Sequence, residues 1–270
     1  MCLYLPIMKG SREQMAQTIL STENATKRFD GLVAVNRINY ALREGESAGI
    51  IGPNGAGKST FFNLLTGYFK PDEGQVFFYG EDITRMPPYE RVNRGIARTF
   101  QLVSVFDTMT VLENMMLARI RMGRNYRSKT RFFFKNVRHR DLMDECLQAL
   151  GTMGIAHKAE TRTSDLSYGE KRELEIAIAL SLNPKVLLLD EPFAGLSQVE
   201  IVNITKVVKA LKGKFSIAIV EHKISKLMEL VEQLYVINEG ELICSGPPDD
   251  VISDPQVREC YWGKEEMACF

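Results

Sequence analysis

The sequence contains no long hydrophobic run. Among its 270 residues, of which 45% are hydrophobic, no apolar stretch approaches the roughly 18–20 residues that a membrane-spanning helix needs. Residues 1–8 have neither a positively charged start nor a long apolar core, so they make a poor secretory signal peptide. We therefore expect a chain that neither crosses a membrane as a helix nor carries a secretion signal.

A net charge of either sign is also missing. The chain has 34 Lys and Arg against 34 Asp and Glu, so no field of the whole molecule draws it to nucleic acid or to a membrane surface. Its cysteines form no C-x-x-C pair and its histidines are scattered, which gives no zinc signature and fits a reducing cytosol. These residues are Cys2, Cys146, Cys244, Cys260, Cys269, His139, His157 and His222.

The length is large for one domain but ordinary for an α/β domain with an inserted subdomain. Met15 stands just before the first strand-like segment, so an early start codon would account for residues 1–14. We predict a dispensable N-terminal extension over 1–17, one domain over 18–263, a helical subdomain inserted at about 102–182, and a C-terminal tail over 264–270.

One stretch fits the phosphate-binding pattern G-x-x-x-x-G-K-[ST] and lies between an apolar strand-like run at 48–51 and an apolar helix-like run at 61–65. Its glycines let consecutive backbone N–H groups point at phosphates. Lys58 would bind the β- and γ-phosphates, and the Ser59 hydroxyl would bind Mg²⁺. The helix expected over 58–66 aims its positive end at the same anion. The stretch is Gly52, Pro53, Asn54, Gly55, Ala56, Gly57, Lys58, Ser59 and Thr60.

Around this loop we expect strands. Alternating apolar residues at Ile38, Tyr40 and Leu42 predict a half-buried strand before it. Phe29 stands just before the Asp30-Gly31 turn, where an aromatic ring can stack on a purine or can be an ordinary core residue. Further strands are expected over 75–79 and 96–100, the second ending at Gln101, with a short helix over 88–95 between them.

Residues 102–182 are expected to be helical, with a capping box at Thr110 and Glu113 and apolar residues at helical spacing over 141–151. Between these lies a basic stretch, residues 119–140, with nine Lys or Arg and no acidic residue, and with three phenylalanines inside it. A solvated loop, a surface facing anionic lipid and a nucleic-acid contact remain open for it.

The last third reads as buried parallel strands at 186–189 and 217–220, a hairpin at 234–244, and a helix over 255–262. The first strand runs into Asp190 and Glu191, and the second runs into His222. Ligands of parallel α/β sheets bind beyond the carboxyl ends of the strands. Four polar features are therefore expected to converge there, namely the phosphate loop, Gln101, Asp190 with Glu191, and His222.

Each of these residues has a role suited to nucleotide hydrolysis. Asp190 can hold Mg²⁺ through water, and Glu191 can orient and deprotonate an attacking water. His222 can donate to the γ-phosphate. Gln101 can reach the metal or the water, and it begins the helical region, to which it can report the nucleotide state.

In order and spacing, these motifs resemble those of an ATP-binding cassette (ABC) ATPase, from residue 18 to residue 263. The resemblance implies an α/β fold: a P-loop NTPase (RecA-like) core with an N-terminal antiparallel β subdomain and an inserted α-helical subdomain. It also implies a signature that completes the ATP site of a second subunit in a head-to-tail dimer. That signature is Leu166, Ser167, Tyr168, Gly169 and Glu170.

The signature departs from the common pattern, with Tyr168 where many relatives have Gly and Glu170 where most have Gln. Gly195-Leu196-Ser197 lacks the acidic residue that many members carry after Glu191. Lys223 follows His222, where this branch often has Asp.

Several segments look like the ATPase subunits of branched-chain amino-acid importers: 98–101, 109–114, 174–177, 220–222 and the ending 261–263. The resemblance therefore implies ATP and Mg²⁺ as cofactors, and ATP hydrolysis coupled to transport at the cytoplasmic face of the cell membrane. It implies as partners a second ATPase subunit (a copy or a paralogue), membrane permease subunits and, indirectly, an external substrate-binding protein.

Alternatives remain. Urea or amide importers and the lipopolysaccharide-export ATPase share much of this pattern. A soluble ABC ATPase acting on ribosomes or DNA is a different class. It is disfavoured because translation-type members carry two cassettes in one chain, and because DNA-repair members insert a coiled coil that is too long to fit between Gln101 and Leu166.

Overall fold

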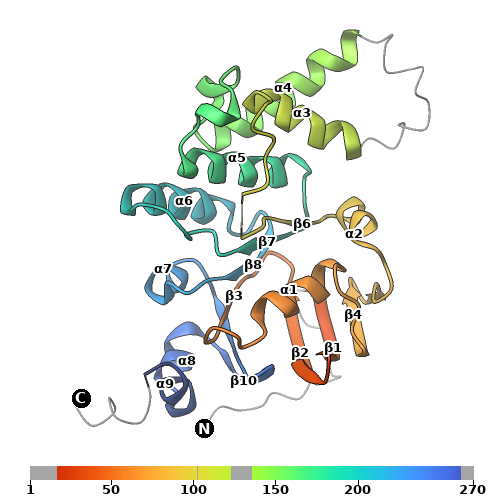
Figure 1. Ribbon diagram of the computed structural model, residues 1–270, viewed down its shortest axis with the longest axis vertical. Coiled ribbons are helices and arrows are strands. Elements are labelled where there is room, and N and C mark those ends of the chain that lie inside the picture. Colours follow the sequence, from red (N-terminus) through yellow and green to blue (C-terminus); the bar gives the residue numbers. More distant parts are fainter. Residues whose placement is uncertain (1–16, 102, 123–135, 263–270) are drawn as a thin grey trace.

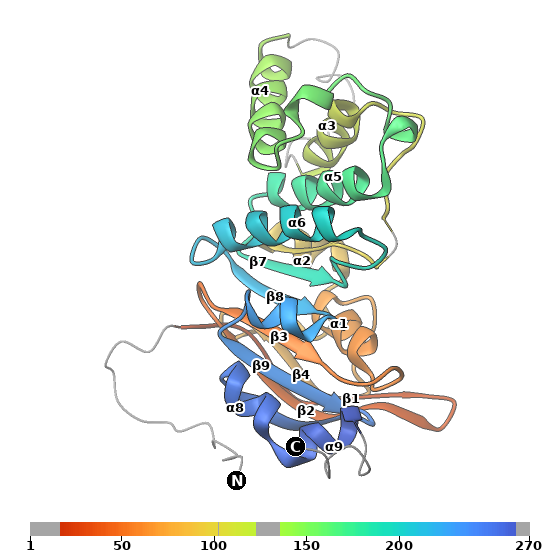
Figure 2. The same ribbon diagram turned by 90° about the vertical axis from the view of Figure 1, so that its left-hand side faces the viewer.

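Two β-sheets and a group of helices form successive layers of the molecule (Figures 1 and 2). This computed structural model describes residues 17–101, 103–122 and 136–262. Almost all of the expected N-terminal extension, the C-terminal tail and most of the basic stretch lie outside these residues. The expected division of the chain into segments therefore stays a prediction at both ends.

The N-terminal sheet is antiparallel, as expected for the β subdomain. Its first two strands pair as a hairpin, and each strand contains 12 residues. The turn at Asp30 and Gly31 is confirmed, and both residues have positive φ, 45° and 89°. The strands, in the spatial order β2-β1-β4-β5, are β2 (Leu32–Arg43), β1 (Thr18–Phe29), β4 (Glu73–Phe78) and β5 (Glu81–Asp82).

The second sheet is the parallel core. All of its neighbouring strands run parallel except the β9–β10 hairpin. The apolar runs at 186–189 and 217–220 form the buried strands β7 and β8, as predicted. In spatial order the strands are β10 (Glu241–Gly246), β9 (Gln233–Asn238), β3 (Ser47–Ile51), β8 (Ser216–Val220), β7 (Val186–Asp190) and β6 (Ile96–Arg98).

Alternate residues of these strands enter two separate cores. Val186 and Leu188 of β7 pack with helix α1 (Lys58–Thr66) between the two sheets. Leu187 and Leu189 face the opposite side, where the other large helices cover the sheet. Because successive strand side chains point to opposite faces, the same five-residue strand supports the phosphate-loop layer on one side and the helical layer on the other.

The helical region contains α3 (Val111–Met122), α4 (Asn136–Thr152) and α5 (Tyr168–Ser181). The capping box before α3 is confirmed: the Thr110 N–H donates to Glu113 at 2.8 Å, and the Glu113 N–H donates to the Thr110 hydroxyl at 3.1 Å. Within α4, Cys146 is buried as its spacing predicted, whereas Met143, assigned to the same apolar set, is 36% exposed.

One expected boundary is wrong. The strand expected to reach residue 100 ends at Arg98, because the Phe100 N–H donates to the Glu175 carboxylate instead of to a strand. Helix α5, inside the region expected to be helical, begins at Tyr168. The remaining helices are α2 (Pro88–Arg94), α6 (Gln198–Leu211), α7 (Ile224–Met228), α8 (Pro248–Ser253) and α9 (Pro255–Trp262), of which α2 and α9 were predicted.

Candidate active site

The carboxyl ends of four adjacent strands carry the candidate residues. In the order β3-β8-β7-β6, these strands run into the phosphate loop at 52–60, His222, Glu191 and Gln101. Asp190 is the last residue of β7. The structure therefore brings together at one edge of the sheet the four features that the sequence placed at strand ends.

The side chain of Lys58 donates hydrogen bonds to the backbone of its own phosphate loop. Lys58 Nζ donates to the carbonyls of Gly52 at 2.7 Å and Pro53 at 2.8 Å. Burial lowers the pKa of Lys58, and the nearby carboxylates of Glu191 and Asp190 act in the opposite direction. The lysine is thus a buried cation held by two neutral oxygens, which a phosphate oxygen would replace as a stronger partner.

Two glycines of the loop have no room for a side chain. Gly57 has φ 100°, and a Cβ there would lie 2.2 Å from the Ala34 carbonyl oxygen. A Cβ at Gly52 would lie 2.0 Å from the Ile237 carbonyl oxygen. Gly57 is the N-cap of α1, where no side chain caps the helix and the first turn contains no acidic residue. This helix start fits an anion, and the exposed Ser59 hydroxyl lies in its first turn.

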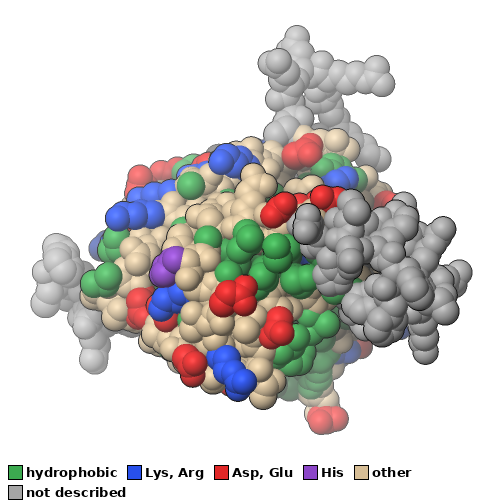
Figure 3. Space-filling view, turned by 90° about the horizontal axis from the view of Figure 1, so that it is seen from above, with side chains coloured by type: hydrophobic (Ala, Val, Ile, Leu, Met, Phe, Trp, Pro, Cys, Tyr) green, Lys and Arg blue, Asp and Glu red, His purple; other side chains and the backbone are tan. Residues whose placement is uncertain are grey.

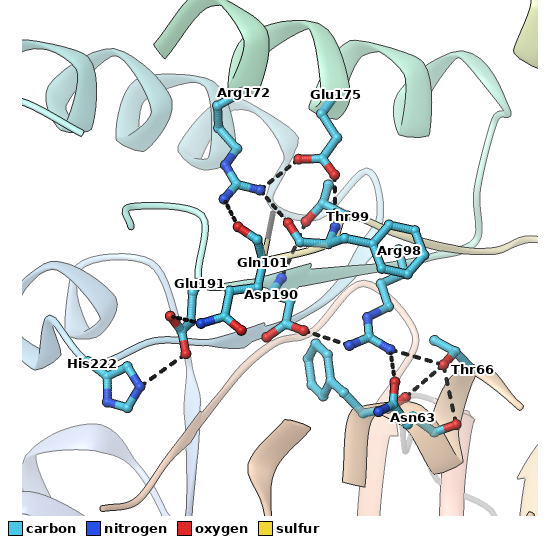
Figure 4. Close-up of polar contacts among 12 residues, drawn as sticks. Asn63, Thr66, Arg98, Thr99, Gln101, Arg172, Glu175, Asp190, Glu191 and His222 are labelled. Carbon is cyan, nitrogen blue, oxygen red and sulfur yellow. Dashed lines mark hydrogen bonds and ion pairs between the residues drawn. The ribbon is translucent and has the colours of Figure 1, made fainter. Parts of the chain in front are cut away.

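Glu191 is held between the two residues expected to share its chemistry (Figure 4). Gln101 Nε2 donates to its Oε2 at 3.1 Å, and His222 Nε2 lies 3.1 Å from its Oε1. Glu191 has a positive φ of 46°, which is uncommon for a residue with a side chain. Its N–H donates to the Val220 carbonyl at 2.9 Å. The start of the loop after β7 is therefore tied to the end of β8.

Asp190 differs from its neighbour in being buried, with 3% of its surface exposed. Arg98 donates to its Oδ2 at 2.6 Å. Its Oδ1 is buried and has no hydrogen-bond partner among the residues that the structure describes. A carboxylate oxygen of this kind suits the hydration shell of Mg²⁺, which prefers oxygen ligands and keeps several waters. The residues present therefore fit the expected metal.

The signature residues lie at the start of α5, on the other face of the parallel sheet from α1. Ser167 is the N-cap, and its hydroxyl accepts from the Glu170 N–H at 3.2 Å. Glu170 accepts from the Ser167 N–H at 2.8 Å and pairs with Lys158. The signature and the phosphate loop therefore belong to helices that pack on opposite faces of the sheet, and the role of the signature at a partner's site stays a prediction.

Two of the departures in sequence have structural partners. Lys158, followed by the Ser167 backbone, holds the pKa of Glu170 below its ordinary value, so the extra charge of the signature is locally balanced. Lys223 Nζ donates to the Phe193 carbonyl at 3.1 Å. This contact ties the segment that carries His222 to the loop after Glu191.

Phe29 is the last residue of β1, next to the turn of the first hairpin. The residue is 38% exposed. It packs edge-on against Phe69, with the ring centroids 5.2 Å apart, and Lys27 Nζ lies 5.4 Å from its centroid. Phe29 is therefore only partly buried, and one face of its surroundings is formed by Phe69. Its contact with a purine stays a prediction.

Sequence reasoning gave no role to several charged residues that support the site. Arg172 of α5 donates to the carbonyls of Phe100 at 2.6 Å and Gln101 at 2.8 Å, and it also pairs with Glu175 (Figure 4). The buried Glu221 accepts from the N–H groups of Phe193 at 2.9 Å and His222 at 2.6 Å. The sequence shows only that Glu221 follows an apolar run. It does not show the contact with Phe193, because the two residues are far apart in the chain.

This fold and this constellation define a nucleoside-triphosphate hydrolase built around a phosphate-binding loop. Residues 35–194 match the family described as ABC transporter, and the chain belongs to that family. Proteins of this family bind ATP and hydrolyse it to power transport. No helix within the described ranges combines the length and the apolar composition of a membrane span.

Three relatives match along most of their length. The chain is 36% identical to the probable branched-chain amino acid transport ATP-binding protein LivG of Archaeoglobus fulgidus, over 92% of this chain and 96% of that protein. It is 34% identical to the high-affinity branched-chain amino acid transport ATP-binding protein LivG of Escherichia coli K12, over 93% and 100%. It is 33% identical to the lipopolysaccharide export system ATP-binding protein LptB of Haemophilus influenzae, over 92% and 98%.

Solved structures show the same fold. A nucleotide-free ATP-binding cassette from an ABC transporter superposes with a TM-score of 0.80 at 34% identity, covering 92% of this chain and all of that one. A dimeric cassette in a post-hydrolysis state, bound to ADP and Pi, gives a TM-score of 0.72 at 26% identity, covering 85% and 99%. The expected fold class is therefore confirmed.

Proposed function

We propose that this chain is the energy-coupling ATPase subunit of a membrane transporter that imports branched-chain or related amino acids. The observation that carries the ATPase part is the position of Glu191 between Gln101 and His222, beside the phosphate loop. The amino-acid part rests on the two LivG relatives, because nothing in this site would have to touch the transported molecule.

The roles proposed for the residues follow from charge and reach. Lys58 and the N–H groups at the start of α1 bind the phosphates of ATP, and Phe29 stacks on its purine. Glu191 takes the proton from the water that attacks the γ-phosphate, and His222 donates to that phosphate. Both Glu191 oxygens are engaged in the present arrangement. Each oxygen keeps a second lone pair, so Glu191 can accept the proton of the attacking water while both contacts hold its carboxylate in place.

Mg²⁺ is proposed to be held by Ser59, Gln101 and Asp190. Bound there, the metal would neutralise charge between the β- and γ-phosphates. Asp190 would offer the hydration shell its Oδ1, which has no hydrogen-bond partner among the described residues. Gln101 donates to Glu191 through Nε2, so its amide oxygen Oε1 can serve the metal while this hydrogen bond is kept.

The partner proposal is a head-to-tail dimer with a second ATPase subunit. In such a dimer, residues 166–170 of one chain face the phosphate loop of the other, giving two sites related by a two-fold axis. The Ser167 hydroxyl accepts one N–H through its oxygen, which leaves its proton free to donate to a partner's γ-phosphate. The capping role and the proposed role at the partner's site are therefore compatible.

Membrane permease subunits are proposed to dock on the helical end of the molecule, at the cytoplasmic face of the cell membrane. Figure 3 shows hydrophobic side chains gathered on the face seen from above, with acidic side chains beside them. Large hydrophobic residues exposed in the helical region include Phe106, Leu117 and Met143. An external substrate-binding protein would act on the permease, and no nucleic acid is needed.

The ATPase proposal is tested with Glu191→Gln. This change keeps the size of the side chain and removes the base, so turnover should fall about 100- to 10,000-fold. Binding of ATP should stay within a few-fold of that of the unchanged protein. Turnover is measured by phosphate release and binding by titration. A variant that hydrolyses ATP at the normal rate would show that Glu191 is not the base.

The runner-up function is lipopolysaccharide export, favoured by the 33% identity to LptB. Glu191→Gln protein, captured from its native host in detergent with ATP and Mg²⁺, separates the candidates by mass spectrometry of its partners. Two permease subunits with an external amino-acid-binding protein would support the importer. A urea- or amide-type binding protein, a lipid-export permease, or ribosomes or DNA without a membrane protein would each point to an alternative.

A further inference from the structure

Arg98 is a charged residue at the end of β6 that is almost completely buried beside the candidate metal site. We propose that Arg98 is a positioning residue, which orients the Asp190 carboxylate so that only Oδ1 is presented to the metal's hydration shell. This inference rests on the proposed metal role of Asp190. It concerns an arginine to which the roles proposed above assign no function.

The guanidinium contacts one oxygen of Asp190 and no other carboxylate among the described contacts. One terminal nitrogen donates to Asp190 Oδ2 at 2.6 Å, and the pair is nearly inaccessible, with side chains 8% and 4% exposed. Oδ1 is equally buried and has no hydrogen-bond partner in the described chain. The two oxygens are therefore chemically unequal, one satisfied by a cation and one available to a ligand.

Arg98 is itself fixed by helix α1. Its other terminal nitrogen donates to Asn63 Oδ1 at 2.6 Å and to the Thr66 hydroxyl at 3.3 Å (Figure 4). The guanidinium carbon lies 5.6 Å from the Phe62 ring centroid and 5.3 Å from that of Phe100. These contacts leave the planar fork little freedom, so the Asp190 carboxylate, bonded to it, is held in one orientation.

The same arginine links three parts of the proposed machinery. Helix α1 begins at the phosphate-binding residues Lys58 and Ser59 and carries the Asn63 anchor one turn later. Strand β6, which carries Arg98, leads directly to Gln101. Because one rigid side chain joins α1, β6 and β7, we infer that it fixes the distance between the phosphate loop and Asp190. Partners behind metal-binding carboxylates typically change metal affinity by about 10- to 100-fold when removed.

Arg98→Lys is the test variant, since it keeps the charge that balances Asp190 but loses the fork that reaches α1 at the same time. Affinity of the full chain for a non-hydrolysable ATP analogue is measured by calorimetry, once with EDTA and once with Mg²⁺. The dissociation constant with EDTA divided by that with Mg²⁺ reports how much the metal alone contributes to nucleotide affinity. A purely structural defect would weaken both measurements and leave their ratio unchanged.

Arg91→Lys is the matched control. Arg91 is another buried arginine that donates to α1, at 2.8 Å to each of the carbonyls of Leu64 and Leu65, but it contacts no carboxylate among the described hydrogen bonds. Asn63→Ala is a second test, because it leaves both charges in place and removes only an anchor of Arg98. It decides the matter if Arg98→Lys does not fold, as judged by thermal unfolding.

In Arg98→Lys we expect the ratio of the EDTA dissociation constant to the Mg²⁺ dissociation constant to be about tenfold smaller than in the unchanged protein. Asn63→Ala should lower this ratio less, and Arg91→Lys should leave it unchanged. The affinities measured with EDTA should stay the same in Arg98→Lys and Asn63→Ala. Asp190→Asn is measured in parallel. If Asp190→Asn loses the metal contribution while Arg98→Lys and Asn63→Ala keep it, the positioning role is wrong and the metal site stands. If Asp190→Asn keeps the full contribution, the proposed metal role fails, and the inference fails with it.

Discussion

Helices α1 and α5 both begin at residues expected to bind the γ-phosphate, but their first turns are built differently. The N-cap of α1 is Gly57, with no side-chain cap and no acidic residue in the first turn. The N-cap of α5 is Ser167, closed by a reciprocal capping box with Glu170. The first helix start leaves its backbone donors to a ligand, whereas the second satisfies some of its own donors.

This difference indicates what each region needs from its surroundings. The start of α1 carries Lys58, which lies near the carboxylates of Asp190 and Glu191 at the end of β7. The start of α5 is stable by itself and lies on the opposite face of the sheet. Its capped first turn needs no ligand to be stable, so it can bind a phosphate held by another subunit without first being ordered by it.

The largest effect is expected at the phosphate loop. Lys58 now donates to the Gly52 and Pro53 carbonyls and would donate to phosphate oxygens when ATP binds. Lys58→Ala removes this cation, so affinity for ATP should fall roughly 10- to 100-fold. Lys70→Ala, at an exposed lysine beyond α1, is the control and should bind normally. Titration with a fluorescent nucleotide measures both. Equal affinities would contradict the role given to Lys58.

An intermediate effect is expected at the α5 cap. Ser167→Ala should lower the free energy of unfolding by about 1 kcal/mol, as capping changes do, and should also lower ATP turnover. Thr110→Ala breaks the similar box before α3 and should cost about the same stability without loss of turnover. Urea unfolding and phosphate release give the two quantities. If both variants lose turnover equally, Ser167 is a cap and nothing more.

The smallest effect concerns pH. Lys158 holds the pKa of Glu170 below its ordinary value, so the unfolded chain takes up this proton at a higher pH than the folded one. The stabilisation is present above the ordinary value of 4.5 and is lost as the pH falls through the folded pKa. Lys158→Met should therefore be less stable than the unchanged protein near neutral pH, and the difference should shrink in acid.

Urea unfolding at several pH values measures this difference, with the exposed Lys214 replaced in the same way as a control. A difference that stays constant from neutral to acidic pH would show that Lys158 acts by packing and not by charge.

Much of this site could be predicted from the sequence because its signals are local. The phosphate loop is one contiguous motif, and the polar residues after β7 and β8 directly follow apolar runs whose carboxyl ends must meet at one edge. The starts of α1 and α3 were also encoded locally, by Gly57 and by the Thr110 box.

The supporting contacts could not be predicted, since they join residues far apart in the chain. Arg98 reaches Asp190 only because β6 pairs with β7. Glu221 reaches Phe193 only because β8 lies beside β7. Glu175 ends β6 early by capturing the Phe100 N–H, which no propensity of residues 96–100 encodes. Such contacts depend on the order of strands in the sheet, which single-sequence patterns leave open.

The most direct test of the account is a complementation experiment with two inactive variants. Lys58→Ala breaks the phosphate loop and Ser167→Arg breaks the signature, so each alone should be nearly inactive. In a head-to-tail dimer of mixed variants one site has both defects and the other has none. The mixture should therefore regain about one quarter of the unchanged activity. A mixture as inactive as its components, or full activity in Ser167→Arg alone, would contradict the proposal that the two regions act on ATP across the subunit boundary.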